Sequence, residues 1–341
     1  MAAMVLLMWG DKAEAHSTLR RLEFGCMDEA NLRCSIGFYR LCLGGLCLGG
    51  RSRGVDRVDP NRFLFVANEV VHMSDALAAH GGPLVNRIVS PELTEALKDA
   101  SVDFPSLTLT LRQLCDLELL TNGGCSPLTG FLGQEDYVRV LQDMRLADGT
   151  LWPIPITLRV GAEEAASLAP GSRVALRDSE GFMLAALNVG EVFEPDLELE
   201  AQRVYGTRSA LHPGVAELNA LPDTRYVSGS VDAVQLPNHY DFQPLRYTPA
   251  ELREQFARIG WRHVVAFHTS RPLHRMQRSI CMEAAKQANG HVLIHPVVGV
   301  ARPGDVSYYT RVKCYRSAER RFPHGIAMLG LLPMALRMAG P

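Results

Sequence analysis

The sequence predicts a mixed α/β protein in which a β-rich domain is followed by an α/β domain. Residues 80–242 contain short apolar or alternating segments, separated by turn signals such as NGG, ADG, PGS and DSEG. From residue 247 the pattern becomes helix, strand, turn, helix and strand, which is typical of an open sheet with parallel strands. Prolines and an asparagine gather between the two patterns, in LPNHYDFQPL at residues 236–245. We therefore expect one domain over 73–242 and another over 247–341.

The composition excludes several classes of protein. The 341 residues are 47% hydrophobic and 21% charged, with a formal net charge of −2, so no whole-chain basic field would recruit nucleic acid or an anionic membrane. No segment reaches the roughly 18 apolar residues of a membrane span, since Pro333 and Arg337 interrupt the nearest one. The eight cysteines form no C-x-x-C pair, which argues against a zinc site. Because the opening residues lack the basic start of a secretory signal, we expect reduced thiols in a cytoplasm.

Residues 1–72 differ from the rest of the chain. They hold four of the eight cysteines and a direct repeat of LCLGG at residues 41–50. Neither a helical stripe nor regular alternation is evident there. We expect a disordered leader, or one translated from a start codon placed too far upstream, because the sequence from Met73 reads as the natural opening of an enzyme.

Within the β-rich domain, two segments have the alternation or the apolar, β-branched content of strands. These are LTLTLRQL at residues 107–114 and WPIPITLRV at residues 152–160. EDYVRVLQDMRL at residues 135–146 has a helical pattern instead. Many short strands with turns at this spacing predict a barrel-like β domain.

The α/β domain is predicted from four successive segments. TPAELREQFARIG, at 248–260, has the start and stop signals of a helix, and WRHVVAF, at 261–267, reads as a buried strand. A helix is expected over 275–289, with Met276, Ile280, Cys281 and Ala284 on its apolar face. HVLIHPVVG, at 291–299, reads as the second buried strand.

The turn between the first strand and the second helix carries the chemistry. In open α/β sheets the ligand sits beyond the carboxyl ends of the strands, where FHTSRPLHRMQ lies at residues 267–277. Pro272 suits the approach to a helix start, and the free amides of residues 275–277 favour an anion. Arg271 and Arg275 offer forked donors that fit phosphate or sulfate oxygens. Solvated loop side chains are the alternative for each residue alone, but the combination favours an oxyanion site.

Several blocks of the chain resemble the ATP sulfurylase family. The turn F-H-T-S-R-P-L-H-R-M-Q is similar to the family signature F-Q-T-R-N-P-x-H-x-x-H. Further family blocks are resembled, in the same order, by HGGPLVNRIVS, DLELLTNGGCSPLTGFL, YGTRSALHPGV, HPVVGVARPGDVSYYTRVKCY and MALRMAGP. Ser209 stands where the family commonly has an acidic residue, and Arg302 stands where lysine is usual. This order of blocks after Met73 is far more specific than one short motif.

The resemblance implies a PUA-like β-rich domain followed by a Rossmann-like α/β nucleotidyltransferase domain. The implied reaction is ATP plus sulfate giving adenosine 5′-phosphosulfate and pyrophosphate, with sulfate attacking the α-phosphorus in line. The implied partners are ATP and sulfate in a homo-oligomer, with neither nucleic acid nor a membrane. Mg²⁺ would arrive with ATP rather than in a protein-bound site.

The same resemblance assigns the site residues by position. Thr269 falls at a family catalytic threonine, and His274 falls at the first histidine of a pair that contacts ATP phosphates. The implied catalytic residues are Thr269, Ser270 and Arg271; the implied ATP-binding residues are His268, Thr269, Ser270, Arg271, His274 and Gln277; the implied sulfate-binding residues are His268, Ser270 and Arg271.

Four of these positions depart from the family pattern. His268 replaces a glutamine, Ser270 replaces the sulfate-binding arginine, and Gln277 replaces the second histidine. Arg271 stands where the family has asparagine, so we expect it to supply the missing guanidinium from one position later.

The family continues beyond the position of Pro341 with a helix, a strand and a G-R-D-H-A-G loop. We therefore expect a truncated product with an incomplete α/β domain, in which Val264, Val265, Ile294 and the leucines after Met328 lose apolar neighbours. Two functions remain open at this point: a sulfate adenylyltransferase, or a non-catalytic remnant that binds an anion or a partner subunit without turnover.

Overall fold

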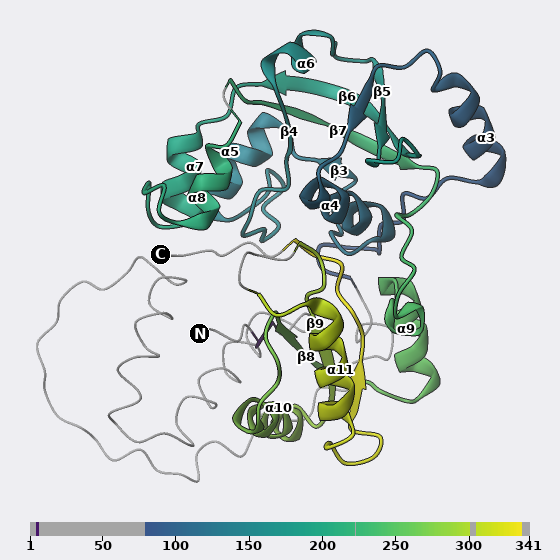
Figure 1. The fold of residues 1–341 in the computed structure, drawn as a ribbon, viewed down its shortest axis with the longest axis vertical. Helices are drawn as coiled ribbons and strands as arrows, with labels where there is room; N and C mark the ends of the chain where they lie inside the picture. Colours follow the sequence, from purple (N-terminus) through teal and green to yellow (C-terminus); the bar gives the residue numbers. More distant parts are fainter. Residues whose placement is uncertain (1–4, 7–78, 222, 301–304, 336–341) are drawn as a thin grey trace, which may run out of the picture. The chain divides into compact units, whose positions relative to one another are not determined.

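The computed structural model describes residues 5–6, 79–221, 223–300 and 305–335 (Figure 1). The leader predicted over residues 1–72 lies outside these residues, apart from Val5 and Leu6. The positions of Arg302 and Arg337 also lie outside them. A β-rich part and an α/β part follow one another along the chain, which confirms the predicted fold class.

The β-rich part is built on a six-stranded sheet with the order β2-β5-β6-β7-β3, and β4 also pairs with β7. The long strands β6 and β7 are antiparallel and form its centre. These pairings leave β2 at one edge and the short strands β3 and β4 at the other, so within the described residues the sheet does not close into the expected barrel. In chain order the elements are α3 Pro91–Ala100, β2 Ser106–Thr108, α4 Leu111–Asn122, β3 Gly130–Phe131, α5 Gln134–Asp143, β4 Leu158–Val160, α6 Ala162–Ala166, β5 Arg173–Arg177, β6 Met183–Phe193, α7 Leu197–Val204, α8 Pro213–Leu218 and β7 Arg225–Ala233.

The strand predicted over residues 107–114 is wrong in its second half. Strand β2 ends at Thr108, and Thr110 caps helix α4. The side chain of Gln113 accepts a hydrogen bond from the Thr110 amide at 2.9 Å, and the Thr110 hydroxyl accepts from the Gln113 amide. This reciprocal cap satisfies two amides that a helix start leaves without partners. It favours a helix from Leu111 more strongly than the alternation of apolar and polar residues favours a strand.

The strand predicted over residues 152–160 is shorter in the structure. Only Leu158–Val160 form β4, because Pro153 and Pro155 lack the amide that a strand ladder requires. The helix predicted over residues 135–146 is confirmed as α5, with Tyr137, Val140 and Leu141 buried.

The α/β part has a four-stranded sheet with the order β1-β8-β9-β10. Strands β8, β9 and β10 are parallel, as the sequence predicts, and β1 pairs antiparallel with β8. The predicted helix and two strands are confirmed, with β8 extending two residues beyond Phe267. The elements are β1 Val5–Leu6, the 3₁₀ turn η3 Gln243–Leu245, α9 Pro249–Arg258, β8 Val264–Thr269, α10 Arg275–Gln287, β9 His291–Pro296, α11 Tyr308–Glu319 and β10 Ala327–Leu329.

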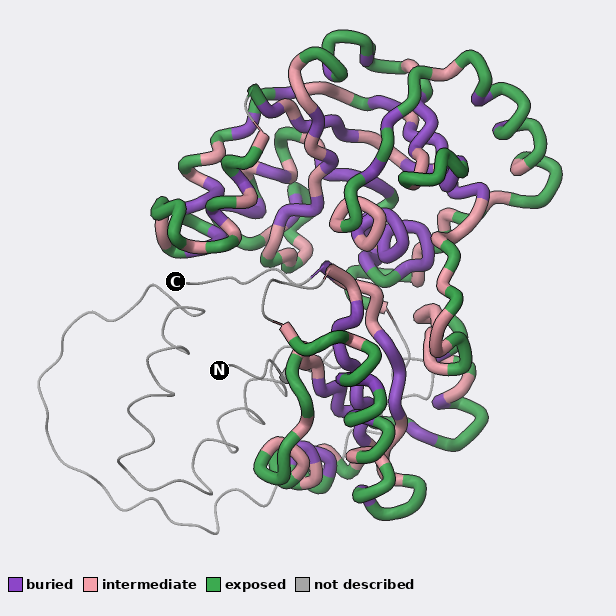
Figure 2. The backbone as a smooth tube through the Cα atoms, viewed as in Figure 1, coloured by how far each residue is buried: buried purple, intermediate pink, exposed green. Residues whose placement is uncertain are grey.

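Helices cover both faces of the parallel sheet. On one face, Phe267 and Ile294 pack with Cys281 of α10 and Tyr315 of α11. On the other face, Ala266 and Leu293 pack with Leu252 and Phe256 of α9. The alternation of side chains along each strand supplies both cores, and Figure 2 shows these strands as largely buried.

The apolar surface expected to lose its neighbours is covered at most of the predicted positions. Val265 is 2% exposed and Ile294 is fully buried, and Leu329 and Leu331 are each 1% exposed. Val264 keeps partial exposure. The expectation is therefore wrong for these buried residues, because α9, α10 and α11 pack directly over the sheet.

Helix α10 buries a different face from the predicted one. Cys281, Ala284 and Ala285 are buried, whereas Met276 and Ile280 are 61% and 41% exposed. The prediction is therefore right for Cys281 and Ala284 and wrong for Met276 and Ile280. The residues at i, i+3 and i+4 from Cys281 form the stripe that meets the sheet, and Met276 and Ile280 lie beside it.

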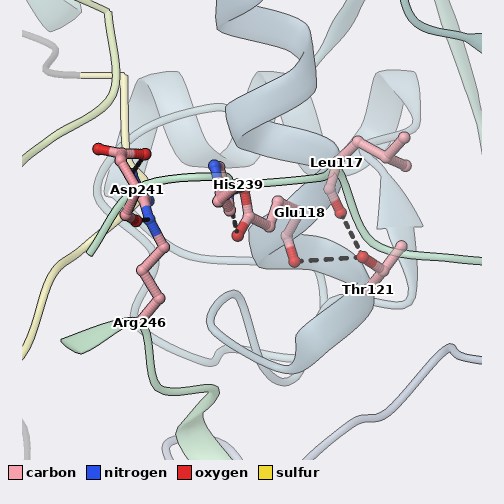
Figure 3. Close-up of polar contacts among 6 residues, drawn as sticks. All are labelled: Leu117, Glu118, Thr121, His239, Asp241 and Arg246. Atoms are coloured by element: carbon pink, nitrogen blue, oxygen red, sulfur yellow. Dashed lines mark hydrogen bonds and ion pairs between the residues drawn. The ribbon is translucent and has the colours of Figure 1, made fainter. Parts of the chain in front are cut away.

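A hydrogen-bonded histidine–carboxylate contact and an ion pair hold the connector between the two parts. Glu118 of α4, which is 7% exposed, contacts Nε2 of His239 with both carboxylate oxygens at 2.9 and 3.0 Å (Figure 3). Arg246 donates to the carboxylate of Asp241 at 3.1 Å and to its carbonyl at 3.0 Å. Across the described part of the chain, every helix is too short or too polar to cross a bilayer.

Candidate functional site

The predicted site residues lie in one exposed turn at the carboxyl end of a parallel strand. Strand β8 ends at Thr269, and α10 begins at Arg275. Arg271 and His274 are exposed, and Ser270 is half-buried. The turn therefore lies at the edge of the sheet where ligands of open α/β folds bind, and solvent reaches its side chains.

The hydroxyl of Thr269 shapes the turn. Its Oγ1 accepts a hydrogen bond from the Arg271 amide at 3.1 Å and donates to the Arg271 carbonyl at 3.0 Å. A hydroxyl that bonds the main chain two residues ahead stabilises a tight turn. Thr269 therefore helps to fix the path by which Arg271 reaches solvent.

Helix α10 directs its N-terminus at the turn. His274 is the N-cap residue in an extended conformation, and the side-chain oxygen of Gln277 accepts from its amide at 3.0 Å. The first intrahelical bond joins the Arg278 amide to the His274 carbonyl at 3.1 Å. The amides of residues 275–277 precede it and have no partner within the helix, and the helix dipole adds to their preference for an anion.

Arginines surround this helix start in different ways. Arg271 and Arg275 are exposed at the turn. Arg278 is half-buried, and its guanidinium carbon lies 5.4 Å from the centre of the Phe322 ring, so stacking fixes it one turn into the helix. Of these three arginines, Arg271 and Arg275 are therefore the ones whose guanidiniums solvent and an anion can reach.

His268 lies deeper than the other site residues. It pairs in register with His295 of β9, and the two ring centres are 5.1 Å apart. Burial lowers the pKa of His268, which the His295 backbone partly offsets. Burial, together with the neighbouring His268, lowers the pKa of His295 to about 3. Both imidazoles are therefore neutral near pH 7, and Nδ1 of His268 is buried with no hydrogen-bond partner among the described residues.

Two side chains of helix α11 hold the turn through hydrogen bonds to its main chain, and the sequence did not predict this role. Arg311, which is 3% exposed, donates to the carbonyls of Ser270 and Val297 at 2.8 and 3.1 Å. The hydroxyl of Tyr315 donates to the Arg271 carbonyl at 2.7 Å. The available signal was an arginine and a tyrosine four residues apart, one above the other on a helix face.

Two observations bear on ligand space and metal binding. A cavity of about 310 Å³ lies beside α9, and its lining, which includes Tyr247, Glu251 and Arg258, contains no residue of the turn. No group of three or more metal-ligating side chains comes together within the described residues. The turn itself offers hydroxyls, imidazoles and guanidiniums, which suit an anion better than the oxygen-preferring Mg²⁺.

Two families match consecutive parts of the chain. Residues 77–236 match the family described as PUA-like domain. Residues 243–341 match the family described as ATP-sulfurylase, and the candidate turn lies within that second match.

Similar proteins extend over the same region. A protein of Mycosarcoma maydis named sulfate adenylyltransferase is 48% identical over 270 residues, which cover 78% of this chain and 47% of the relative. One of Saccharomyces cerevisiae with the same name is 47% identical over 266 residues, covering 77% and 52%. A solved structure described as a hexameric APS kinase from Thiobacillus denitrificans superposes with a TM-score of 0.64 at 37% identity, covering 77% of this chain and 48% of that one. The chain spans about half the length of these relatives.

Proposed function

Because this chain belongs to the ATP-sulfurylase family, we propose that it is a sulfate adenylyltransferase. In this reaction an oxygen of sulfate attacks the α-phosphorus of ATP in line, a P–O bond forms, and the bond to pyrophosphate breaks. The products are adenosine 5′-phosphosulfate and pyrophosphate, and no covalent intermediate on the protein is needed. The main task of the protein is to hold two mutually repelling anions in line.

The observation that supports this proposal best is the exposed turn at the start of α10. It joins the N-terminal amides of a 13-residue helix to the guanidiniums of Arg271 and Arg275. Preorganised donors of this kind stabilise developing negative charge without rearranging during the reaction. The turn therefore has the features that a phosphoryl-type transfer requires of a protein.

We assign the proposed roles within this turn by position. Arg271 binds sulfate through its guanidinium, and His274 contacts the phosphates of ATP. Ser270 offers a hydroxyl donor to the same anions. The Thr269 hydroxyl donates its one proton to the Arg271 carbonyl, so it can donate to an anion only by giving up that bond. His268, being neutral and half-buried, contributes a single hydrogen-bond donor rather than charge.

Gln277 weakens the proposed site relative to the family pattern. Its oxygen is engaged by the His274 amide, which leaves its amide nitrogen as the donor toward a phosphate. Glutamine cannot carry the positive charge of a histidinium, so stabilisation of pyrophosphate falls by about 1–3 kcal/mol if the lost contact is charge-assisted.

The remaining parts of the proposal concern the cofactor and the assembly. Mg²⁺ arrives with ATP and lowers the charge on its phosphates, held by those phosphates and not by protein side chains. The chain divides into a PUA-like domain over 73–242 and a nucleotidyltransferase domain over 247–341. We also propose a homo-oligomer in the cytoplasm; the oligomer is supported by the similar structure described as hexameric.

The proposal is tested by measuring pyrophosphate release with ATP, Mg²⁺ and sulfate. Replacing Arg271 with alanine should lower kcat/KM for sulfate by roughly 10- to 100-fold, because a charge-assisted contact is worth about 1.5–3 kcal/mol. Arg271→Lys should recover part of this loss, and Arg316→Ala removes an exposed arginine of α11 as a control. An Arg271→Ala variant with normal sulfate kinetics would refute the assigned role.

The second candidate is an anion-binding protein without turnover. It is favoured by replaced positions of the signature, among them Ser270 and Gln277. Release rates equal to those of the Arg271→Ala, His274→Ala double variant would support this candidate, provided that calorimetry still detects binding of pyrophosphate.

A further inference from the structure

Helix α11 contacts two main-chain carbonyls of the candidate turn, and its Tyr315 also interacts with the side chain of Thr269. From this geometry we propose that Arg311 and Tyr315 are positioning residues of the anion site, an inference that rests on the function proposed above. They hold the carbonyl oxygens of Ser270 and Arg271 toward α11, so that the turn presents donors and not acceptors to the anion.

Arg311 joins three separate segments of the chain. Its Nη1 donates to the carbonyls of Ser270 at 2.8 Å and Val297 at 3.1 Å, and its Nε donates to the carbonyl of Val306 at 3.0 Å. These carbonyls belong to the turn after β8, the end of β9 and the approach to α11. With only 3% of its surface exposed, the side chain depends on these acceptors, because a buried guanidinium must have its donors satisfied.

Tyr315 extends the same contact by one residue along the turn. It follows Arg311 by four residues, so both side chains project from one face of α11. Its hydroxyl donates to the Arg271 carbonyl at 2.7 Å, and the side chain is fully buried. Burial raises the pKa of Tyr315, although the nearby Arg311 opposes this, so the hydroxyl remains a donor at physiological pH.

The direction of these carbonyls matters for an anion. A carbonyl oxygen carries partial negative charge, and one that faced sulfate or a phosphate would repel it. Two consecutive carbonyls, those of Ser270 and Arg271, are engaged on the side of α11. Without the bond from Arg311, rotation of the Ser270 peptide plane would bring an acceptor toward the ligand and move the Arg271 side chain that follows. Without the bond from Tyr315, the Arg271 carbonyl would be held by the Thr269 hydroxyl alone.

The buried positive charge of Arg311 acts in the same direction. Its guanidinium lies within hydrogen-bond distance of the turn's own backbone, in a region of low dielectric where charge is poorly screened. The same side chain therefore both orients the turn and raises the electrostatic potential beneath it.

The test uses the full chain with two pairs of variants. Tyr315→Phe removes one donor without changing the packing volume, and Arg311→Lys keeps the charge but cannot reach three carbonyls. Tyr226→Phe is the matched control for losing a buried tyrosine hydroxyl, since Tyr226 donates to Glu200 at 2.9 Å in the β-rich part. Arg316→Lys is the matched control on the exposed face of α11.

We expect Tyr315→Phe and Arg311→Lys to lower kcat/KM for sulfate by about three- to thirtyfold, mainly through kcat, with KM for ATP changing less than twofold. Loss of folded protein would also lower the apparent kcat with KM unchanged, so all rates are expressed per folded molecule, with the folded fraction measured by circular dichroism. The two control variants should keep wild-type kinetics even if their melting temperatures fall. Wild-type kinetics in both Tyr315→Phe and Arg311→Lys would overturn the inference.

Calorimetric titration with inorganic pyrophosphate separates this inference from the proposed function. If the wild type binds pyrophosphate but does not turn over, the proposed function fails, and a five- to tenfold weaker affinity in Tyr315→Phe and Arg311→Lys alone still supports positioning. Equal affinity in all variants contradicts positioning whether or not turnover occurs. A wild-type chain that neither turns over nor binds pyrophosphate refutes both statements.

Discussion

His268 and His295 place two imidazoles side by side at the carboxyl ends of β8 and β9, where an anion would be bound. A pair of histidines beneath an anion site would be expected to contribute positive charge. Burial prevents this, because it lowers the pKa of both side chains and holds the pair neutral. The positive charge of the site therefore comes from arginine, and the histidines contribute packing and single hydrogen bonds.

The depressed pKa of His295 links the stability of the fold to pH. Between the ordinary value near 6.5 and the folded value of about 3, the unfolded chain binds more protons than the folded chain. The free energy of unfolding should therefore be highest above pH 6.5 and fall as the pH is lowered through this window. Each unit of pKa depression corresponds to about 1.4 kcal/mol, so the loss amounts to a few kcal/mol.

Replacing His295 with asparagine should flatten this pH dependence. The measurement is the urea-induced unfolding free energy at several pH values from 7.5 down to 4, compared as a slope and not as an absolute value. His324→Asn, which removes an exposed imidazole, should keep the wild-type slope. An unchanged slope in His295→Asn would show that this side chain does not carry the dependence.

At the scale of single elements, helix caps decide where helices begin. Helix α9 starts after Thr248, whose hydroxyl accepts from the Glu251 amide at 3.3 Å, while the Glu251 carboxylate accepts from the Thr248 amide at 2.7 Å. Pro249 occupies the first helical position, where no amide is needed. These signals lie within four residues of one another, so the sequence predicts this helix correctly.

Removing the cap of α9 should weaken the cover over one face of the parallel sheet. Thr248→Ala is expected to lower the free energy of unfolding by about 1 kcal/mol, because it leaves the Glu251 amide without its partner. Thr248→Ser keeps the hydroxyl and should behave like the wild type. The two variants are compared by urea denaturation followed by tryptophan fluorescence, since Trp261 packs with Phe256 of this helix.

The sequence predicts elements whose signals are local, and it fails where the deciding partner is distant. Strands β8 and β9 follow from apolar runs, and the turn between β8 and α10 follows from its clustered polar side chains. Arg311 reads as an ordinary helix-surface arginine, because two of its three acceptors are carbonyls 14 and 41 residues away and leave no side-chain pattern. The burial of Cys281 in place of Met276 likewise depends on how α10 is rotated against the sheet.

At the scale of the whole molecule, the connector is held by side-chain polar contacts. His239 contacts the buried carboxylate of Glu118, and Asp241 contacts Arg246. The carboxyl group of Asp241 also interacts with Tyr308 of α11, and its pKa is lowered because this bond and Arg246 outweigh the opposing effect of burial. The connector is thus attached both to a helix of the β-rich part and to a helix of the α/β part.

Glu118→Ala should release the connector. The substitution leaves Nε2 of His239 without its partner, and the lost contact is worth roughly 1–3 kcal/mol. Limited digestion with trypsin, followed by mass spectrometry, should therefore show cleavage after Arg246 several times faster than in the wild type. Glu254→Ala, which removes an exposed carboxylate of α9, is the control. Equal cleavage rates in Glu118→Ala and wild type would contradict this role.

The hydrogen bonds of Arg311 to three carbonyls have a consequence for which substitutions the turn tolerates. A carbonyl is the same whichever amino acid carries it, so this anchor does not depend on the identities of residues 270, 297 and 306. Side chains along the turn are consequently free to be exchanged while the chain keeps its path. The carbonyls of Ser270 and Arg271 are held by α11 whichever side chains these two residues carry.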